Sequence, residues 1–150
     1  LANQLDVPVF LSSMLQVPFI SNIIGDDKKI AILSANGNSL NDKELLKKVG
    51  IKSKKNLIIR GLEKKKHFYD AIIEETGTLN FEKIKKEVVN ESKNLLKENN
   101  NIASFLLECS VLPPYAKAVQ EATSLPVFDY MTMINYVYSA LVQRRYEGIY

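Results

Sequence analysis

Short apolar runs alternate with longer amphipathic segments along this chain. The apolar runs are typical of buried strands, and the segments between them have apolar residues at helical spacing. Strands are predicted over residues 7–13, 30–34 and 56–60, in the run that begins at Ser104, and over residues 126–129. Helices are predicted over residues 41–49, 79–98, 115–123 and 130–146, with a helical segment within 64–76 and a linking helix or two short turns over 14–24.

Strands that alternate with helices favour a parallel sheet joined by right-handed crossovers. We therefore expect an α/β fold with a four-stranded parallel sheet, flanked by helices in three layers and in flavodoxin-like strand order. Residues 7–13 would be an extra strand. The helix over 130–146 is apolar almost all round, so we expect a larger assembly to bury it on both sides. In this chain alone, that surface would be exposed or covered by a second copy.

Composition narrows the functional classes. The 150 residues include one cysteine and one histidine, too few for an intramolecular disulfide or a zinc site. The formal net charge of +3 is no argument for nucleic-acid binding. No apolar run approaches the roughly 20 residues of a membrane span, and no signal-peptide or nucleotide-binding motif is present. We expect a cytoplasmic protein that uses no metal or cofactor and binds neither nucleic acid nor membrane.

The only cysteine, Cys109, follows the strand that begins at Ser104. Ligands of open α/β sheets bind beyond the carboxyl ends of the strands, so Cys109 is predicted to face such a crevice. A helix predicted from Tyr115 would place the thiol near a helix N-terminus, which lowers a thiol pKa. The alternative is that Cys109 is a small buried hydrophobic residue. Its neighbours Glu108 and Ser110 are possible site residues, or simply a strand-end charge and a helix cap.

A second strand-to-helix corner reads Ser-Ala-Asn-Gly-Asn-Ser after the strand over 30–34. By position, Ser34, Asn36 and Asn38 are candidates for substrate binding. The alternative is ordinary turn chemistry, in which Asn38 or Ser39 caps the next helix.

The run LLECSVLPPYAKAVQEATSLPVFDYMTMINYVYSAL resembles the C-terminal part of the aspartate/glutamate racemase superfamily, in a branch with an LEC-(S/T)-x-x-PPYA motif. The stretches VPVFLSSMLQVP, KKIAILSAN and LIIRGLE follow that branch's order. The resemblance implies cofactor-independent acid/base chemistry by cysteine at the carbon next to a carboxylate. It also implies two similar α/β halves, each supplying one thiol to a site between them.

On this resemblance, Cys109 is the thiol of the second half, and Ser110 binds the carboxylate of a small carboxylic or amino acid. Glu108 precedes the cysteine in this branch too, without a clear role. Glutamate racemases have a histidine after the second cysteine, but in this chain Val111 and Leu112 occupy that region and the histidine is absent. Glutamate is therefore a doubtful substrate.

A short internal sequence similarity agrees with an architecture of two similar halves. Val-Pro-Val-Phe over residues 7–10 resembles Leu-Pro-Val-Phe over 125–128, with similar flanking order. If this is a repeat, the counterpart of Cys109 would lie before Leu1. We thus expect residues 1–24 to be a strand and linker from a missing N-terminal half, and 25–150 to be the C-terminal domain.

The sequence leaves three functions open. One is a part, inactive alone, of an amino-acid racemase or related isomerase; another is a single-cysteine decarboxylase of the same superfamily. The third is a non-catalytic domain that binds a small acid or serves assembly. The expected protein partner is a second copy or the missing half.

Overall fold

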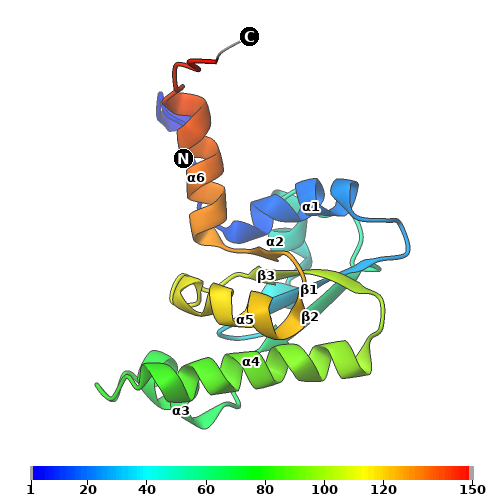
Figure 1. Ribbon diagram of the computed structural model, residues 1–150, viewed down its shortest axis with the longest axis vertical. Coiled ribbons are helices and arrows are strands. Elements are labelled where there is room, and N and C mark those ends of the chain that lie inside the picture. The colour runs from blue at the N-terminus through cyan, green and yellow to red at the C-terminus, as the bar shows by residue number, and fades with distance from the viewer. Residues whose placement is uncertain (1, 149–150) are drawn as a thin grey trace.

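The computed structural model describes residues 2–148, so the outermost residues of the predicted segments 1–24 and 25–150 lie outside the description. Its centre is a four-stranded parallel sheet in the order β2-β1-β3-β4 (Figure 1). The strands are β1 (Lys29–Ser34), β2 (Leu57–Gly61), β3 (Ile102–Leu107) and β4 (Val127–Phe128). In the central strand, Ile32 pairs with Ile59 of β2 and with Leu106 of β3. The predicted α/β fold, parallel sheet and strand order are confirmed.

Helices cover both faces of the sheet and form the two outer layers (Figure 1). One face carries α1 (Val17–Ile23) and α2 (Lys43–Lys48). The other carries α3 (Lys66–Phe68), α4 (Phe81–Glu98) and α5 (Ala116–Thr123). The last helix, α6 (Tyr130–Leu141), follows β4. Single-turn helices connect these elements at Ala2–Gln4, Ser13–Gln16, Ser39–Asn41 and Pro113–Tyr115, and a π-helical turn spans Tyr69–Ile73.

The strands read as continuous apolar runs because both faces of the sheet are buried. Successive side chains point to opposite faces, so each strand supplies two cores. Leu33 and Phe105 pack toward α4 and α5, whereas Ile32 and Leu106 pack toward α1 and α2; all four are fully buried.

Helix α4 presents one apolar stripe to the sheet. Its N-cap residue Asn80 accepts a hydrogen bond from the Lys83 N–H at 3.0 Å, and Ile84, Val88 and Leu95 are fully buried. Glu91 lies on the same stripe with 3% of its surface exposed. Burial of a carboxylate requires partners, and Arg60 and Lys65 form ion pairs with it.

The prediction of a strand over residues 7–13 is wrong. This segment approaches the end of β3 through side chains, so it does not add a strand to the sheet. The Ser13 hydroxyl donates to the Leu107 carbonyl at 3.4 Å, and Ser12 caps the single-turn helix Ser13–Gln16. The cap of α2 also differs: Asp42 accepts from the Glu44 N–H at 2.7 Å, because a separate turn, Ser39–Asn41, precedes this helix.

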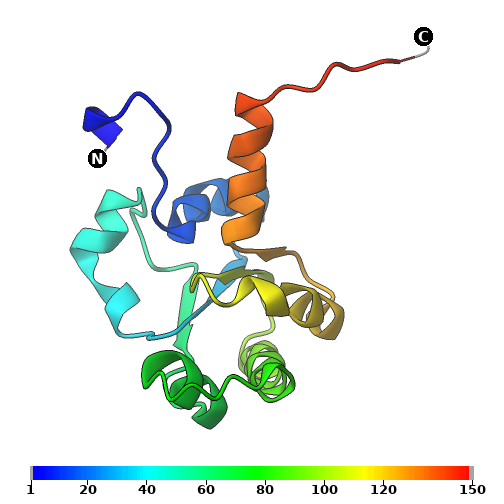
Figure 2. The same ribbon diagram turned by 90° about the vertical axis from the view of Figure 1, so that its left-hand side faces the viewer.

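Helix α6 ends at Leu141 and stands away from the layers of the sheet (Figure 2). Met133 is its buried apolar residue, whereas Tyr136 is 72% and Leu141 61% exposed. An apolar groove of about 610 Å³ runs between α6 and the region of α1, where Phe19 faces Tyr136. That a second copy or a missing half covers this surface stays a prediction. Among the helices described, none combines the length and hydropathy needed to cross a membrane.

Candidate active site

The candidate site lies where the carboxyl ends of β1 and β3 meet. The chain leaves β1 toward β2 on one side and later returns to form β3 on the other, which makes this the switch point of the sheet. Ser34 ends β1, and Glu108 follows β3 directly. The Glu108 N–H donates to the Leu33 carbonyl at 2.8 Å, which fixes the two strand ends side by side. The two corners singled out from the sequence therefore meet.

Glu108 is held in place by two hydroxyl groups. The Ser12 hydroxyl donates to one carboxylate oxygen, and the Ser34 hydroxyl donates to the other, both at 3.3 Å. Burial raises the pKa of Glu108, while the two hydroxyls act in the opposite direction. Ser34, predicted to bind substrate, thus contacts Glu108.

Cys109 is half-buried and free. Burial raises the pKa of its thiol, and the charge of Glu108 raises it further, against the backbone groups of Val111 and Ala35. The prediction that this position lowers the thiol pKa is therefore wrong. The reason is geometric, because the chain first turns back from Cys109 to Leu112 and α5 begins only at Ala116. Desolvation is the larger effect.

Tyr130 is a member of the site that sequence reasoning missed. Its hydroxyl donates to the Leu11 carbonyl at 3.1 Å. Burial raises the pKa of Tyr130, and the nearby charges of Glu108 and Cys109 add to the effect. The available signal was its place two residues after the end of β4, because parallel strands end at the same edge of a sheet. Asp129 begins α6 there with a capping box and positions Tyr130.

Ser12 and Ser13 were missed as well. Both lie at the end of the segment 7–13 that was predicted to be a strand, and their partners lie more than ninety residues later, at separations of 96 and 94 positions. Nothing in the local pattern indicates such a contact.

The other predicted site residues lie apart from this cluster or at its rim. Ser110 is exposed on the turn after Cys109. The Asn36 side chain accepts from the Asn38 N–H at 2.9 Å, which is the turn chemistry given above as the alternative. Asn38 is exposed and lines a separate polar pocket with Arg60 and Glu63.

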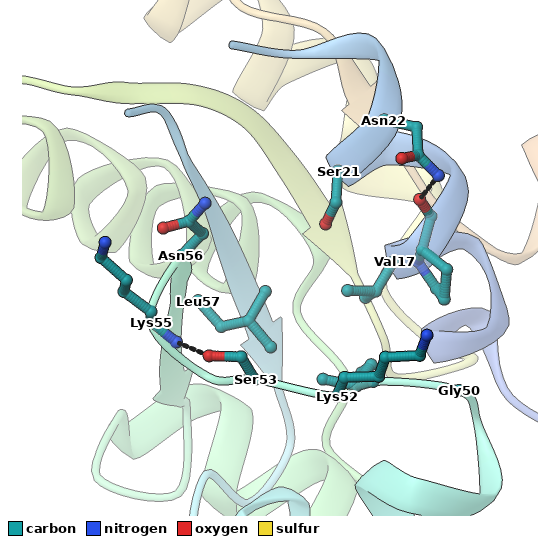
Figure 3. A pocket seen from close by; sticks show the side chains of 11 residues that line it. Val17, Ser21, Asn22, Gly50, Lys52, Ser53, Lys55, Asn56 and Leu57 are labelled. Carbon is teal, nitrogen blue, oxygen red and sulfur yellow. Dashed lines mark hydrogen bonds between the residues drawn. The ribbon is translucent and has the colours of Figure 1, made fainter. Parts of the chain in front are cut away.

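A cavity of about 470 Å³ lies elsewhere, between α1 and the loop that leads into β2 (Figure 3). Leu57, the first residue of β2, lines it, so it opens at the edge of the sheet opposite to Cys109. Within residues 2–148, no group of three or more His, Cys, Asp or Glu side chains is placed to hold a metal ion.

Comparison with known proteins gives a consistent set of relatives. A dimethylsulfoniopropionate lyase of Durusdinium sp. clade D is 30% identical over 145 residues, which cover 95% of this chain and 48% of that protein. Dimethylsulfoniopropionate lyase 7 of Emiliania huxleyi (strain CCMP1516) is 33% identical, covering 96% of this chain and 44% of its own length. Lyase 3 of the same strain is 31% identical, covering 95% and 38%. This chain thus spans about half or less of these relatives. No family model and no solved structure matches it.

These names correct the functional prediction. The assignment to the aspartate/glutamate racemase superfamily, with its isomerase reaction, is wrong, because the relatives that match nearly the whole chain are named lyases. The names also give no support to the decarboxylase or to the non-catalytic domain. The motif around Cys109 indicated a site, but a site of this kind on an α/β scaffold does not determine the reaction.

Proposed function

We propose that this chain forms part of an enzyme that cleaves dimethylsulfoniopropionate. The observation that carries the proposal is that five relatives with this name match 95% or 96% of the chain at 30% to 33% identity. The local arrangement at the ends of β1 and β3 supports it, because a thiol and a carboxylate lie there, near enough to the Tyr130 phenol for their charges to affect its pKa.

The structure of dimethylsulfoniopropionate determines which bonds the site must break and form. Dimethylsulfoniopropionate carries a carboxylate at one end and a positively charged dimethylsulfonium group on carbon 3. A base removes a proton from carbon 2, and the electron pair of that C–H bond forms a double bond between carbons 2 and 3. The C3–S bond breaks with its pair going to sulfur. Dimethyl sulfide and acrylate leave, and the proton stays on the base.

Cys109 is the proposed base. It lies at the switch point of the sheet, with backbone groups of Val111 and Ala35 beside the sulfur to stabilise a thiolate. Its raised pKa makes the thiolate a stronger base but reduces the fraction present at neutral pH. We therefore expect the rate of cleavage to increase with pH through the alkaline range.

Glu108 is proposed to attract the cationic end of the substrate. Its carboxylate is held by Ser12 and Ser34 and lies close to Tyr130, whose ring offers a second favourable surface for a cation. In this arrangement Ser34 positions Glu108. The exposed hydroxyl of Ser110, next to the thiol, remains the candidate partner for the substrate carboxylate.

The test is release of dimethyl sulfide, measured by gas chromatography, together with acrylate. It uses the complete protein encoded by the gene that contains this sequence. We expect the two products in equal amounts. Cys109→Ala should lower the rate about 100-fold or more, which is the usual contribution of a positioned acid or base. Glu108→Gln should raise KM more than it lowers kcat.

Ser139→Ala is a matched control, because this hydroxyl is exposed on α6 and bonds the Tyr136 carbonyl. Its activity should equal that of the unmodified protein. If no dimethyl sulfide is released, the lyase proposal is wrong. If Cys109→Ala releases it at the normal rate, the enzyme assignment stands but the base is another group.

A further inference from the structure

Helix α2 and the connection from it to β2 concentrate positive charge. Residues 43–55 contain six lysines and one glutamate, a formal charge of +5. The whole chain carries +3, so its remaining residues sum to −2. The lysines are Lys43, Lys47, Lys48, Lys52, Lys54 and Lys55.

This charge is not neutralised within the described part of the chain. Elsewhere, basic side chains pair with carboxylates, as Arg60 does with Glu98 and Lys66 with Asp70. Among residues 2–148, the ion pairs include none of the six lysines of this stretch. Lys54 instead donates to neutral oxygens of Asn41, at 2.8 Å and 3.2 Å.

Five of the six lysines line a concave part of the surface. Lys43, Lys47, Lys52 and Lys54 line a cavity of about 690 Å³ between α2 and the loop that follows it. Gly50, Ile51, Lys52 and Ser53 also line the adjoining cavity of about 470 Å³, so the two form one concave surface that reaches α1. In Figure 3 the Ser21 hydroxyl points into this space from α1, and the Lys52 side chain extends from the loop toward the start of that helix.

The loop that carries Lys52, Lys54 and Lys55 is held to the body of the protein. Gly50, with φ of +79°, turns the chain at the end of α2, and its N–H donates to the Lys47 carbonyl at 3.0 Å. The Ile51 N–H donates to the Leu46 carbonyl at 2.9 Å, and the Ile51 side chain is buried in the core on this face. The positive charges therefore occupy a defined concave surface.

The residues of this surface select a class of ligand. Lysines bind phosphate as point charges, and hydroxyl groups such as those of Ser21 and Ser53 donate to phosphate oxygens. Between residues 2 and 148, no aromatic side chain and no arginine lines either cavity, so these residues offer neither base stacking nor bidentate recognition of phosphate. Cavity volumes of several hundred Å³ suit a small molecule.

We propose that the concave surface formed by α1, α2 and residues 50–54 binds a small anion that carries several phosphate groups. It lies at the amino-terminal edge of the sheet, opposite to Cys109. Its ligand therefore does not compete with a substrate at the candidate active site.

The test is isothermal titration calorimetry of the full chain with sodium tripolyphosphate at low ionic strength. We expect one saturable site whose affinity falls as salt is added. The double variant Lys47→Gln/Lys52→Gln should weaken binding about tenfold or more, because it removes two charges from the surface. Both side chains are exposed, so the fold should be retained.

The matched control is Lys83→Gln/Lys93→Gln, which removes the same charge from exposed positions on α4. It should bind tripolyphosphate within about twofold of the unmodified chain. Equal weakening by both double variants, or no saturable binding, would overturn the proposal. Binding to a short DNA duplex or to phosphatidylserine vesicles without binding to tripolyphosphate would also overturn it, in favour of a macromolecular surface.

Discussion

Replacing Glu91 with glutamine should destabilise the protein strongly, because it removes one charge from the buried contact between α4 and β2. One oxygen of Glu91 accepts from Arg60 Nη1 at 2.7 Å, and the other pairs with Lys65. The Glu91 side chain is 4% exposed, whereas the Arg60 and Lys65 side chains are 35% and 31% exposed. The substitution keeps the shape and leaves two cations without their shared counter-charge.

The magnitude follows from this partial burial. Removing one partner of a fully buried ion pair costs about 3–5 kcal/mol. Here water still reaches a third of each cation, and Arg60 keeps its pair with Glu98, so we expect a loss of about 2–3 kcal/mol. Glu98→Gln is a matched control, because Glu98 pairs with the same Arg60 at 2.5 Å but its side chain is 49% exposed. That change should cost about 1 kcal/mol or less.

Urea unfolding followed by circular dichroism measures both variants. Burial acts to raise the pKa of Glu91, but Lys65 and Arg60 outweigh it and lower the pKa. The stabilisation by Glu91 is therefore complete above the unfolded pKa of about 4.3 and is lost as the pH falls through the folded pKa. The difference between Glu91→Gln and the unmodified protein should narrow in acid. The reasoning is refuted if the two variants cost the same at neutral pH, or if the difference widens in acid.

Three other changes test the site and its supports. Iodoacetamide should alkylate Cys109 faster as the pH rises beyond neutral, because burial, and to a smaller extent the charge of Glu108, raise the thiol pKa. Glu108→Gln should therefore speed alkylation at neutral pH, and an unchanged rate would contradict the effect of Glu108 on the thiol. Gly37→Ala should lower the free energy of unfolding by about 1–3 kcal/mol, because the new Cβ would lie 2.7 Å from the Gly61 nitrogen. An unchanged free energy of unfolding would show that the backbone at Gly37 and Gly61 can move apart to accept the methyl group. Asp129→Ala should cost about 1 kcal/mol through loss of the α6 cap, and Asp129→Asn should restore most of it in the same unfolding assay.

Much of the fold can be predicted from local pattern, because the parallel strands are buried on both faces. The apolar run around Ile32 matches β1 closely, and the run that begins at Ser104 covers β3 except for its first two residues. Strand order followed from the alternation of elements. The prediction of a strand over residues 7–13 was wrong because side-chain hydrogen bonds from Ser12 and Ser13 hold this apolar segment without adding it to the sheet.

The site was predicted only in part for a related reason. Position in the alternating pattern brings Ser34 and Cys109 to one edge, but it gives no account of which side chain contacts which. The bond from Ser12 to Glu108 joins positions 96 residues apart, and Tyr130 reaches the cluster from the opposite end of the chain. The direction in which the Cys109 pKa is shifted depends on desolvation, which cannot be predicted from the local sequence.

The reaction was out of reach for a different reason. A motif around a thiol marks where chemistry happens, whereas the outcome depends on what the substrate carries beyond its carboxylate. The motif around Cys109 therefore led to the prediction of an isomerase, whereas the relatives are named lyases.

The projecting helix α6 has a consequence for hydrogen exchange. Most of its side chains lie in solvent, so its amide protons should exchange with deuterium through local fraying, long before those of β1 and β3, which exchange on global opening. Any molecule that covers the helix would slow this exchange selectively. The amides from Ile134 to Leu141 thus form a built-in reporter of association, readable by mass spectrometry without a label.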